Sequence, residues 1–180
     1  MDGGRADLVF ADPPYNLPIN GPVSGKGRIR HREFAQGAGE LSREEFIRFL
    51  TVGYGLLARY SRDGAIHYVC MDWRHAHELL AAGRDVYSEL KNIAVWVKSN
   101  GGLGSLYRSR HEFVFVFKSG TGPHTNNVAL GKHGRNRTNV WHYDSAGTQA
   151  RKGNNPARPA PDGQAGRAGD GRAARLLEPR

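Results

Sequence analysis

Five consecutive residues near the start of the chain carry the groups most suited to chemistry: Asp12-Pro13-Pro14-Tyr15-Asn16. Asp12 supplies a carboxylate, Pro13 a carbonyl on a backbone with restricted φ, and Tyr15 an aromatic ring. A carboxylate and a rigidly held carbonyl can together accept both N–H bonds of an amine, and an aromatic ring can stack on a planar partner. Asp-Pro and Pro-Pro are also common turn formers, so a simple strand terminator is the alternative interpretation.

The elements that must position this string alternate between strand and helix. The predicted elements are a buried strand over 7–11, a helix from an N-cap at Ser42 with Glu45 to about residue 60, a strand over 65–70 after a turn at 62–64, a helix over 73–89 that Gly83 can break, and strands over 92–98 and 111–118. Residues 16–41, rich in Gly, Pro and charge, predict a long loop.

This alternation predicts an α/β fold with a mostly parallel sheet. The last two predicted strands are joined by about a dozen residues without a helical pattern. They therefore predict an antiparallel hairpin at one edge of the sheet. In open sheets of this kind functional sites lie at the carboxyl ends of strands, which is where Asp12 follows the first strand.

The string and its position resemble the catalytic motif of amino-methyltransferases, which use S-adenosylmethionine to methylate exocyclic amines of DNA bases. Three further segments are similar to a bacterial and phage DNA methyltransferase subfamily: GAIHYVCMDWRH at 64–75, KNIAVWVKSNGGLGSLYRSRHEFVFVFKSG at 91–120 and GRNRTNVWHYD at 134–144. The resemblance implies a partial DNA methylase N4/N6 domain over 1–145 with an incomplete, Rossmann-like methyltransferase sheet. It implies a site-specific enzyme of the restriction–modification type.

The resemblance also assigns catalytic roles to Asp12, Pro13, Pro14 and Tyr15. The Asp12 carboxylate and the Pro13 carbonyl would orient the target amine toward the sulfonium methyl, so catalysis would rest on positioning and electrostatics. Tyr15 would stack on a base extruded from the duplex. The DPPY string favours adenine N6 over cytosine N4, which the same group of enzymes also methylates.

Basic residues in three loops are the expected DNA contacts, since Lys and Arg side chains neutralise phosphates. They are Lys26, Arg28 and Arg30 after the catalytic string, Lys98, Arg108 and Arg110, together with the neutral amide of Asn100, around the Gly-rich segment 101–104, and Arg135 and Arg137 in a segment that resembles a target-recognition region. An ordinary solvated face is the alternative for the middle group. His111 and Glu112 open the last strand, where a base-pocket role and a structural role are equally compatible with the pattern.

Charge and composition support a nucleic-acid partner and exclude several other classes. The net charge is +9 and the sequence pI about 10.0, which favours a polyanion such as DNA. Residues 146–180 carry +4 of that charge and no Val, Ile, Phe, Trp, Tyr, Met or Cys, so they predict a disordered basic tail. No apolar run is long enough for a membrane span, and no secretory signal pattern is present, which favours a cytoplasmic, nucleoid-associated protein. The chain has a single cysteine, Cys70, and its residues show no spacing typical of metal ligands, so the sequence predicts no metal site.

Two segments that the resemblance implies are missing: a Gly-rich cofactor loop after the recognition region, and a strand upstream of the first. We therefore expect a chain truncated at both ends, with Asp12 as its one cofactor contact, weak binding of S-adenosylmethionine and little activity. Read one nucleotide later, codons permitted by Ala157–Arg180 can give LALHPTVKPVALVTDALLDCSSR. That peptide contains the His-Pro-Thr-x-Lys-Pro string with which the family opens its cofactor region, so we hypothesise that the tail is frameshifted. The gene sequence decides this hypothesis.

Three alternative functions are compatible with the same residues. The first is a non-catalytic, DNA-binding remnant that keeps the basic loops. The second is cytosine-N4 methylation by the parent enzyme. An RNA-binding module is a third and weaker alternative, because basic and aromatic residues suit it but no RNA-specific motif is present. The oligomeric state has no signature in the sequence.

Overall fold

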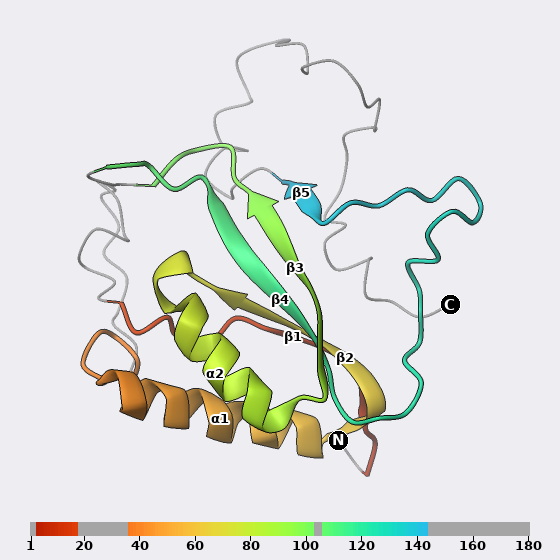
Figure 1. The fold of residues 1–180 in the computed structure, drawn as a ribbon, viewed down its shortest axis with the longest axis horizontal. Coiled ribbons are helices and arrows are strands. Elements are labelled where there is room, and N and C mark those ends of the chain that lie inside the picture. Colours follow the sequence, from red (N-terminus) through yellow and green to blue (C-terminus); the bar gives the residue numbers. More distant parts are fainter. Residues whose placement is uncertain (1–2, 18–35, 103–105, 144–180) are drawn as a thin grey trace. The chain divides into compact units, whose positions relative to one another are not determined.

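The computed structural model describes residues 3–17, 36–102 and 106–143, which form a mixed α/β arrangement within the unit Met1–Tyr143 (Figure 1). The elements are β1 (Ala6–Ala11), α1 (Arg43–Arg59), β2 (Ser61–Met71), the 3-10 turn η2 (Trp73–His75), α2 (Ala76–Val86), β3 (Glu89–Val97), β4 (His111–Lys118) and β5 (Val140–His142). Most of the expected loop after Asn16 and the tail 146–180 lie outside the described residues. Within the described part, no helix combines the length and apolarity needed to cross a membrane.

The strands of the described residues form one sheet in the order β1-β2-β4-β3-β5. β1 pairs with β2 and β3 with β5 in parallel, whereas β4 pairs antiparallel with both β2 and β3. The predicted α/β class is confirmed, but two details differ from the prediction. Parallel and antiparallel pairings are equally frequent, and the hairpin is not at an edge, because β5 lies outside β3. The sequence pattern misses β5, since its three residues are too few to show an alternation.

β2 begins earlier than the pattern predicts. The register of β1 with β2 steps from Ala6–Ser61 to Leu8–Ile66, so the expected turn at 62–64 is an irregularity inside the strand. Gly64 there has φ +85°, and the space that a Cβ would need is taken by the carbonyls of Gly122 and Pro123. This close approach and the positive φ both require glycine.

α1 begins where the capping box predicts. The Ser42 hydroxyl accepts a hydrogen bond from the Glu45 N–H at 3.3 Å, and the Glu45 carboxylate accepts one from the Ser42 N–H at 2.9 Å. These bonds satisfy N–H groups that have no partner within the helix. The buried face of α1 consists of Phe46, Leu50 and Tyr54.

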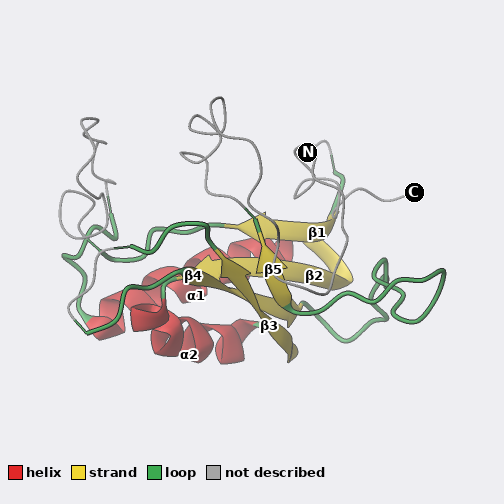
Figure 2. Cartoon of the chain, turned by 90° about the horizontal axis from the view of Figure 1, so that it is seen from above, coloured by secondary structure: helices red, strands yellow, loops and turns green. Residues whose placement is uncertain are grey.

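Both described helices cover the same face of the sheet (Figure 2). Alternate strand side chains meet them there: the core contains Phe46, Leu50, Tyr54, Val69, Met71, Leu79, Ala82, Tyr87, Phe115 and Phe117. Each fully buried large side chain contributes about 1.5–3 kcal/mol. On the opposite face a small cluster of Cys70, Ala94 and Val114 is contacted by Tyr15, Tyr68 and Trp141. The chemistry described below lies at the end of this second face.

Gly83 does not break α2, which continues to Val86. It lies instead where the helix packs on β4: a Cβ at Gly83 would be 2.7 Å from Cζ of Phe117, which itself stacks on Tyr87 at 4.6 Å. The helix approaches the sheet closely at this point because the residue has no side chain. The position is therefore a packing requirement rather than a hinge.

The two glycine environments give matched substitutions. Gly83→Ala is expected to lower the free energy of unfolding by about 1–3 kcal/mol through overpacking against Phe117. Gly53→Ala in α1 has open space around the new methyl, so it should raise that free energy by up to about 1 kcal/mol through helix propensity. Urea unfolding followed by circular dichroism measures both, and a shift of the two variants in the same direction would contradict this packing.

Candidate functional site

The Asp12–Asn16 string, for which the sequence predicts a catalytic role, lies at the carboxyl end of β1, on the sheet face that the helices leave open. Ala11 pairs with Val69 across β1 and β2, so Asp12 follows at the level of Cys70. Cys70 in turn pairs with Val114 on β4. Since side chains alternate along strands, Asp12 and Cys70 share one face.

The next row of the same face brings in two more polar side chains from β4 and the end of β3. Glu112 pairs with Trp96, and Lys98 follows Trp96 by two residues. The Lys98 backbone N–H donates to the Arg110 carbonyl at 2.7 Å, which extends the hairpin by one more bond. The topology thus places residues from three separate segments at the same end of neighbouring strands, where β1 ends and β4 begins.

These side chains form a continuous hydrogen-bonded cluster, which we call the Tyr15 cluster: Asp12, Tyr15, Lys98 and Glu112. The Tyr15 hydroxyl donates to Asp12 Oδ1 at 2.6 Å and lies 3.3 Å from Glu112 Oε2. The other oxygen of Glu112 forms an ion pair with Lys98 Nζ. That ammonium also lies 5.2 Å from the centroid of the Trp96 ring, a cation–π distance.

The environment keeps two groups of the site protonated. Burial raises the pKa of Tyr15 well above its ordinary value, and the Glu112 charge and the hydrogen bond to Asp12 act in the same direction. Tyr15 is therefore a neutral donor at physiological pH. Burial, followed by the charges of Asp12 and Glu112, raises the pKa of the Cys70 thiol to about 12, against an opposing effect of Lys98. The Cys70 thiol therefore stays protonated and packs as an apolar side chain beside Asp12 rather than acting as a nucleophile.

Asn16 fixes the backbone that leaves the string. It is 7% exposed and has φ +52°. Its Nδ2 donates to the Leu41 carbonyl at 2.8 Å, and its Oδ1 accepts from the N–H groups of Gly39 and Leu41 at 3.1 and 3.2 Å. Gly37, with φ +74°, packs so closely on Pro14 that a Cβ would lie 2.8 Å from its ring. Residues 37–41 are thus held against the string.

The other predicted residues are dispersed. Lys98 points into the Tyr15 cluster, while Arg108 donates to the carbonyls of Gly101 and Gly102, each at 3.0 Å, and Arg110 to the Lys98 carbonyl at 3.3 Å. Asn100 is exposed nearby. Arg108, Arg110 and Asn100 thus flank the site, whereas Lys98 is part of it.

Two predicted DNA contacts lie elsewhere on the chain. Arg135 and Arg137 are exposed in the segment between β4 and β5 (Figure 1). This segment begins at the end of β4 that is opposite to Glu112. Arg135 donates to the Asn127 carbonyl at 3.4 Å. Lys26, Arg28 and Arg30 lie outside the described residues. The structure therefore brings Asp12, Tyr15 and Lys98 together and leaves this arginine pair apart from them.

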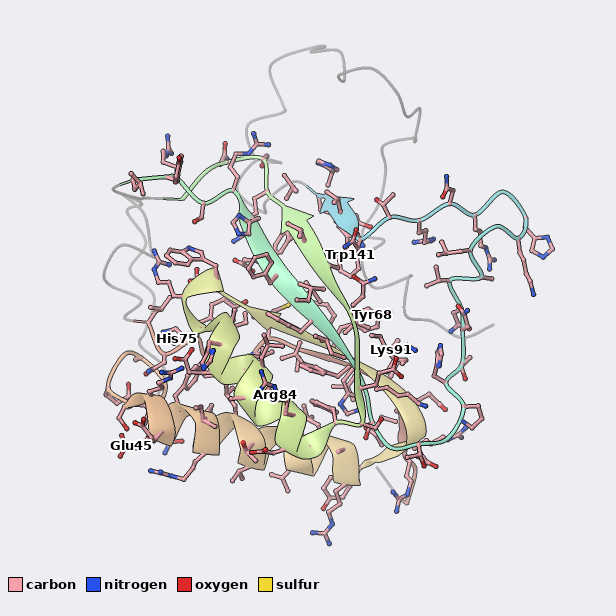
Figure 3. The ribbon with its side chains drawn as sticks, viewed as in Figure 1. Glu45, Tyr68, His75, Arg84, Lys91 and Trp141 are labelled. Atoms are coloured by element: carbon pink, nitrogen blue, oxygen red, sulfur yellow. The ribbon has the colours of Figure 1, made fainter. Side chains whose placement is uncertain are left out.

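Sequence reasoning left the role of Glu112 open and assigned none to Asn16. It also missed an aromatic pair, Tyr68 and Trp141. Tyr68 and Trp141 approach each other over the small cluster, with ring centroids 6.3 Å apart (Figure 3). The strand pattern placed Tyr68 correctly, but its contact with Trp141 depends on the pairing of β5. No group of three or more His, Cys, Asp or Glu side chains that could hold a metal occurs in the part of the chain that the structure describes.

Comparison with solved structures bears on the fold. Among solved structures, PvuII DNA methyltransferase (cytosine-N4-specific) aligns with a TM-score of 0.54 and 12% identity over 81% of this chain and 54% of that chain, which shows a shared fold. The M1.HpyAVI–SAM complex aligns with a TM-score of 0.47 and 11% identity over 79% and 58%, and M1.HpyAVI with 0.44 and 12% over 77% and 57%. The chain spans little more than half the length of these proteins.

The family itself is given by a match to the sequence. A search of curated proteins gives no match. A family model described as DNA methylase, for N6 and N4 methyltransferases, matches residues 6–161. This match covers most of the chain and includes Asp12, Tyr15, Lys98 and Glu112. The chain therefore belongs to the N6/N4 DNA methylase family.

Proposed function

We propose that this chain holds an exocyclic amine of an extruded DNA base for methylation, as part of a site-specific DNA methyltransferase. The observation that carries the proposal is the exposed Asp12 carboxylate at the end of β1, one oxygen of which accepts the Tyr15 hydroxyl. Among the described residues no hydrogen bond to Oδ2 is present, so this oxygen can accept from an incoming amine.

The roles of the string follow from the chemistry of the amine. An aromatic amine is nearly planar because its lone pair is delocalised, and it is a poor nucleophile. Asp12 Oδ2 and the Pro13 carbonyl accept its two N–H bonds and favour a more tetrahedral nitrogen. Pro14 restricts the backbone that links Pro13 to Tyr15, and the Tyr15 ring stacks on the base. The rate gain comes from positioning and fixed electrostatics.

Adenine N6 is the amine we favour over cytosine N4. The support is the resemblance of the DPPY string to the catalytic motif of amino-methyltransferases, among which this string favours adenine N6. The likeness to the cytosine-N4-specific PvuII enzyme concerns the fold and does not bear on the base. Both bases present the same group to Asp12, so product analysis must decide between them.

S-adenosylmethionine is the methyl donor we propose, and when bound it supplies an electrophilic methyl group. Asp12 fits the reactive end of this cofactor as an exposed carboxylate. In the described part of the chain, the buried polar atoms without a hydrogen-bond partner are Tyr54 Oη, His75 Nδ1 and Glu78 Oε2. The last two lie 3.6 Å from each other, and all three belong to helical elements rather than to the Tyr15 cluster. The described residues therefore fit the reacting end only, and we expect this chain to bind the cofactor weakly.

Binding of short single strands tests the amine-holding role without the cofactor. Wild-type protein should bind an oligodeoxyadenylate about tenfold more tightly than an equally long oligomer of purine deoxyriboside, which lacks the 6-amino group, because a hydrogen bond to a charged group contributes about 1.5–3 kcal/mol. Asp12→Ala should remove most of this amine preference, since only the Pro13 carbonyl then accepts from the amine, and should change the affinity for the purine oligomer much less. Fluorescence anisotropy measures both dissociation constants.

The matched control is Asp7→Ala, which removes another exposed aspartate of β1, one that pairs with Arg62 at 2.9 Å. It should keep the full preference. A wild-type chain that binds both oligomers equally contradicts the proposal and favours the DNA-binding remnant. Mass spectrometry of nucleosides from DNA incubated with the chain and S-adenosylmethionine then separates N6-methyladenine from N4-methylcytosine.

The exposed arginines between β4 and β5 are proposed to contact the DNA backbone. Replacing Arg135 and Arg137 by Ala should reduce the slope of log K against log salt on duplex DNA by about 1.8, because each neutralised phosphate contributes about 0.9. Arg84→Ala, on the outer surface of α2 (Figure 3), is the matched control. An unchanged slope in the double variant would remove both residues from the interface. This DNA partner also motivates our expectation of a nucleoid-associated location.

A further inference from the structure

Tyr15 has more polar neighbours than a stacking ring needs. Its hydroxyl lies within hydrogen-bond distance of two carboxylates, at 2.6 Å from Asp12 and 3.3 Å from Glu112. A phenol carries one proton, so it donates fully to one carboxylate at a time. A phenylalanine ring would stack on a base equally well without any of these groups. The hydroxyl and Glu112 therefore need an explanation beyond stacking.

We propose that Lys98, Glu112 and Tyr15 are positioning residues that fix the Asp12 carboxylate for the incoming amine. The inference rests on the proposed function and deepens it. The terminal torsion of an aspartate is soft, so an untethered carboxylate samples many orientations. The Tyr15 hydroxyl holds Oδ1 of Asp12, which fixes the direction of Oδ2. Of the four side chains of the Tyr15 cluster, Asp12 alone touches the amine, whose other N–H bond is accepted by the Pro13 carbonyl.

Glu112 Oε2, at 3.3 Å, is a second and more distant acceptor for the Tyr15 hydroxyl, and we infer that it keeps this hydroxyl at the Asp12 end of the site. Its side chain is 19% exposed, and that of Lys98 is 28% exposed. Two carboxylates around one hydroxyl repel each other, and the Lys98 ammonium offsets this repulsion by pairing with Glu112. Without Lys98, Glu112 would lose the ion pair that holds its side chain beside the Tyr15 hydroxyl.

The sheet itself makes Lys98 a fixed member of this cluster. Its backbone is tied to Arg110 by an N–H donated at 2.7 Å, and the Arg110 guanidinium donates back to the Lys98 carbonyl at 3.3 Å. Its ammonium lies against the Trp96 ring. These contacts come from β3 and β4, while Asp12 follows β1. The cluster thus ties both hairpin strands to the carboxylate.

The amine preference of single strands tests this inference. Glu112→Gln should reduce the roughly tenfold preference for oligodeoxyadenylate over the purine oligomer about threefold, and Tyr15→Phe should do the same while keeping the ring. The double variant should be no worse than Tyr15→Phe alone, since Glu112 acts through the hydroxyl. In all three, the loss of affinity should be larger for the oligodeoxyadenylate than for the purine oligomer, whereas a merely structural defect would weaken the binding of both oligomers equally.

Lys98→Met separates positioning from phosphate binding. As a positioning residue, Lys98 should change the amine preference alone, whereas a phosphate contact would weaken binding of both oligomers and overturn its assignment here. The control Glu89→Gln removes an exposed carboxylate paired with Lys91 at 3.0 Å at the opposite end of β3, and should have no effect. Urea midpoints of all variants report their folding.

The possible failures are distinguishable. If Tyr15→Phe keeps the full amine preference while Asp12→Ala loses it, Tyr15 only stacks and this inference is wrong. If Glu112→Gln and Tyr15→Phe are additive in the double variant, Glu112 does not act through the hydroxyl, which also overturns it. If the wild-type chain shows no amine preference, the proposed function itself fails and the inference falls with it.

Discussion

Replacing Asn16 by alanine is expected to lower the free energy of unfolding by about 3 kcal/mol. The side chain is buried and makes three hydrogen bonds to the backbone of residues 39–41. Its loss leaves the Leu41 carbonyl and two N–H groups without these partners, and buried polar groups that lose a partner cost about 1–3 kcal/mol each before relaxation or hydration. Alanine also tolerates φ +52° less well than asparagine. Urea unfolding measures the change.

Two comparison variants separate these causes. Asn16→Gly removes the same bonds but accepts the positive φ, so it should be about 1 kcal/mol more stable than Asn16→Ala. Asn126→Ala removes an exposed asparagine whose Oδ1 accepts from the N–H groups of Val128 and Ala129. It should cost less than about 1 kcal/mol. An Asn16→Ala variant as stable as Asn126→Ala would show that Asn16 does not hold residues 37–41.

The parts of the fold that depend on local pattern were predictable. The capping box placed the start of α1, and alternating apolar residues placed β1, β3 and β4 to within a few residues. The position of Asp12 at the end of a strand followed from the apolar run before it and the prolines after it. The prediction that this strand is buried was wrong, because β1 lies at the edge of the sheet and Phe10 is 52% exposed. These signals are local, because capping, turn chemistry and strand alternation act between neighbours in the sequence.

The parts that depend on pairing between distant segments were not predictable. The order β1-β2-β4-β3-β5 puts β4 beside β2, which no local pattern encodes. Glu112 reaches Tyr15 only because of that order, since the two residues are 97 positions apart. Asn16 stood within the recognised string, but its role depends on where residues 39–41 return. Lys98 looked like a DNA contact because its charge was visible in the sequence and its partner was not.

A buried histidine makes the fold sensitive to acid. His67 on β2 is 0% exposed, with Nε2 at 2.9 Å from the Ser61 hydroxyl and Nδ1 at 3.0 Å from the Tyr87 hydroxyl. Ser61 donates its single proton to the Leu57 carbonyl at 2.7 Å, so its oxygen accepts from His67 Nε2–H. Nδ1 is then the acceptor for the Tyr87 O–H. The geometry thus selects one neutral tautomer, and protonation of Nδ1 removes its acceptor.

Burial lowers the pKa of His67 from 6.5 to about 4. The unfolded chain therefore binds a proton at this residue between these values and the folded chain does not. The stability contributed is fully present above pH 6.5 and is lost as the pH falls from 6.5 to 4, by about 3 kcal/mol in total. Below pH 4 both states are protonated at this residue and it causes no further loss.

Urea unfolding of wild type and His67→Gln between pH 7 and pH 4 isolates this loss. Glutamine does not titrate, so the variant should be less stable than wild type at pH 7, because it packs and hydrogen-bonds less well, but should lack the His67 part of the acid-dependent slope. The control His77→Gln removes an exposed histidine of α2 and should keep the wild-type slope. A parallel loss of stability in His67→Gln and wild type over this range would contradict the prediction. His67 would then take up its proton in the folded state as readily as in the unfolded state, and the network of Ser61, His67 and Tyr87 would not be the source of the acid sensitivity.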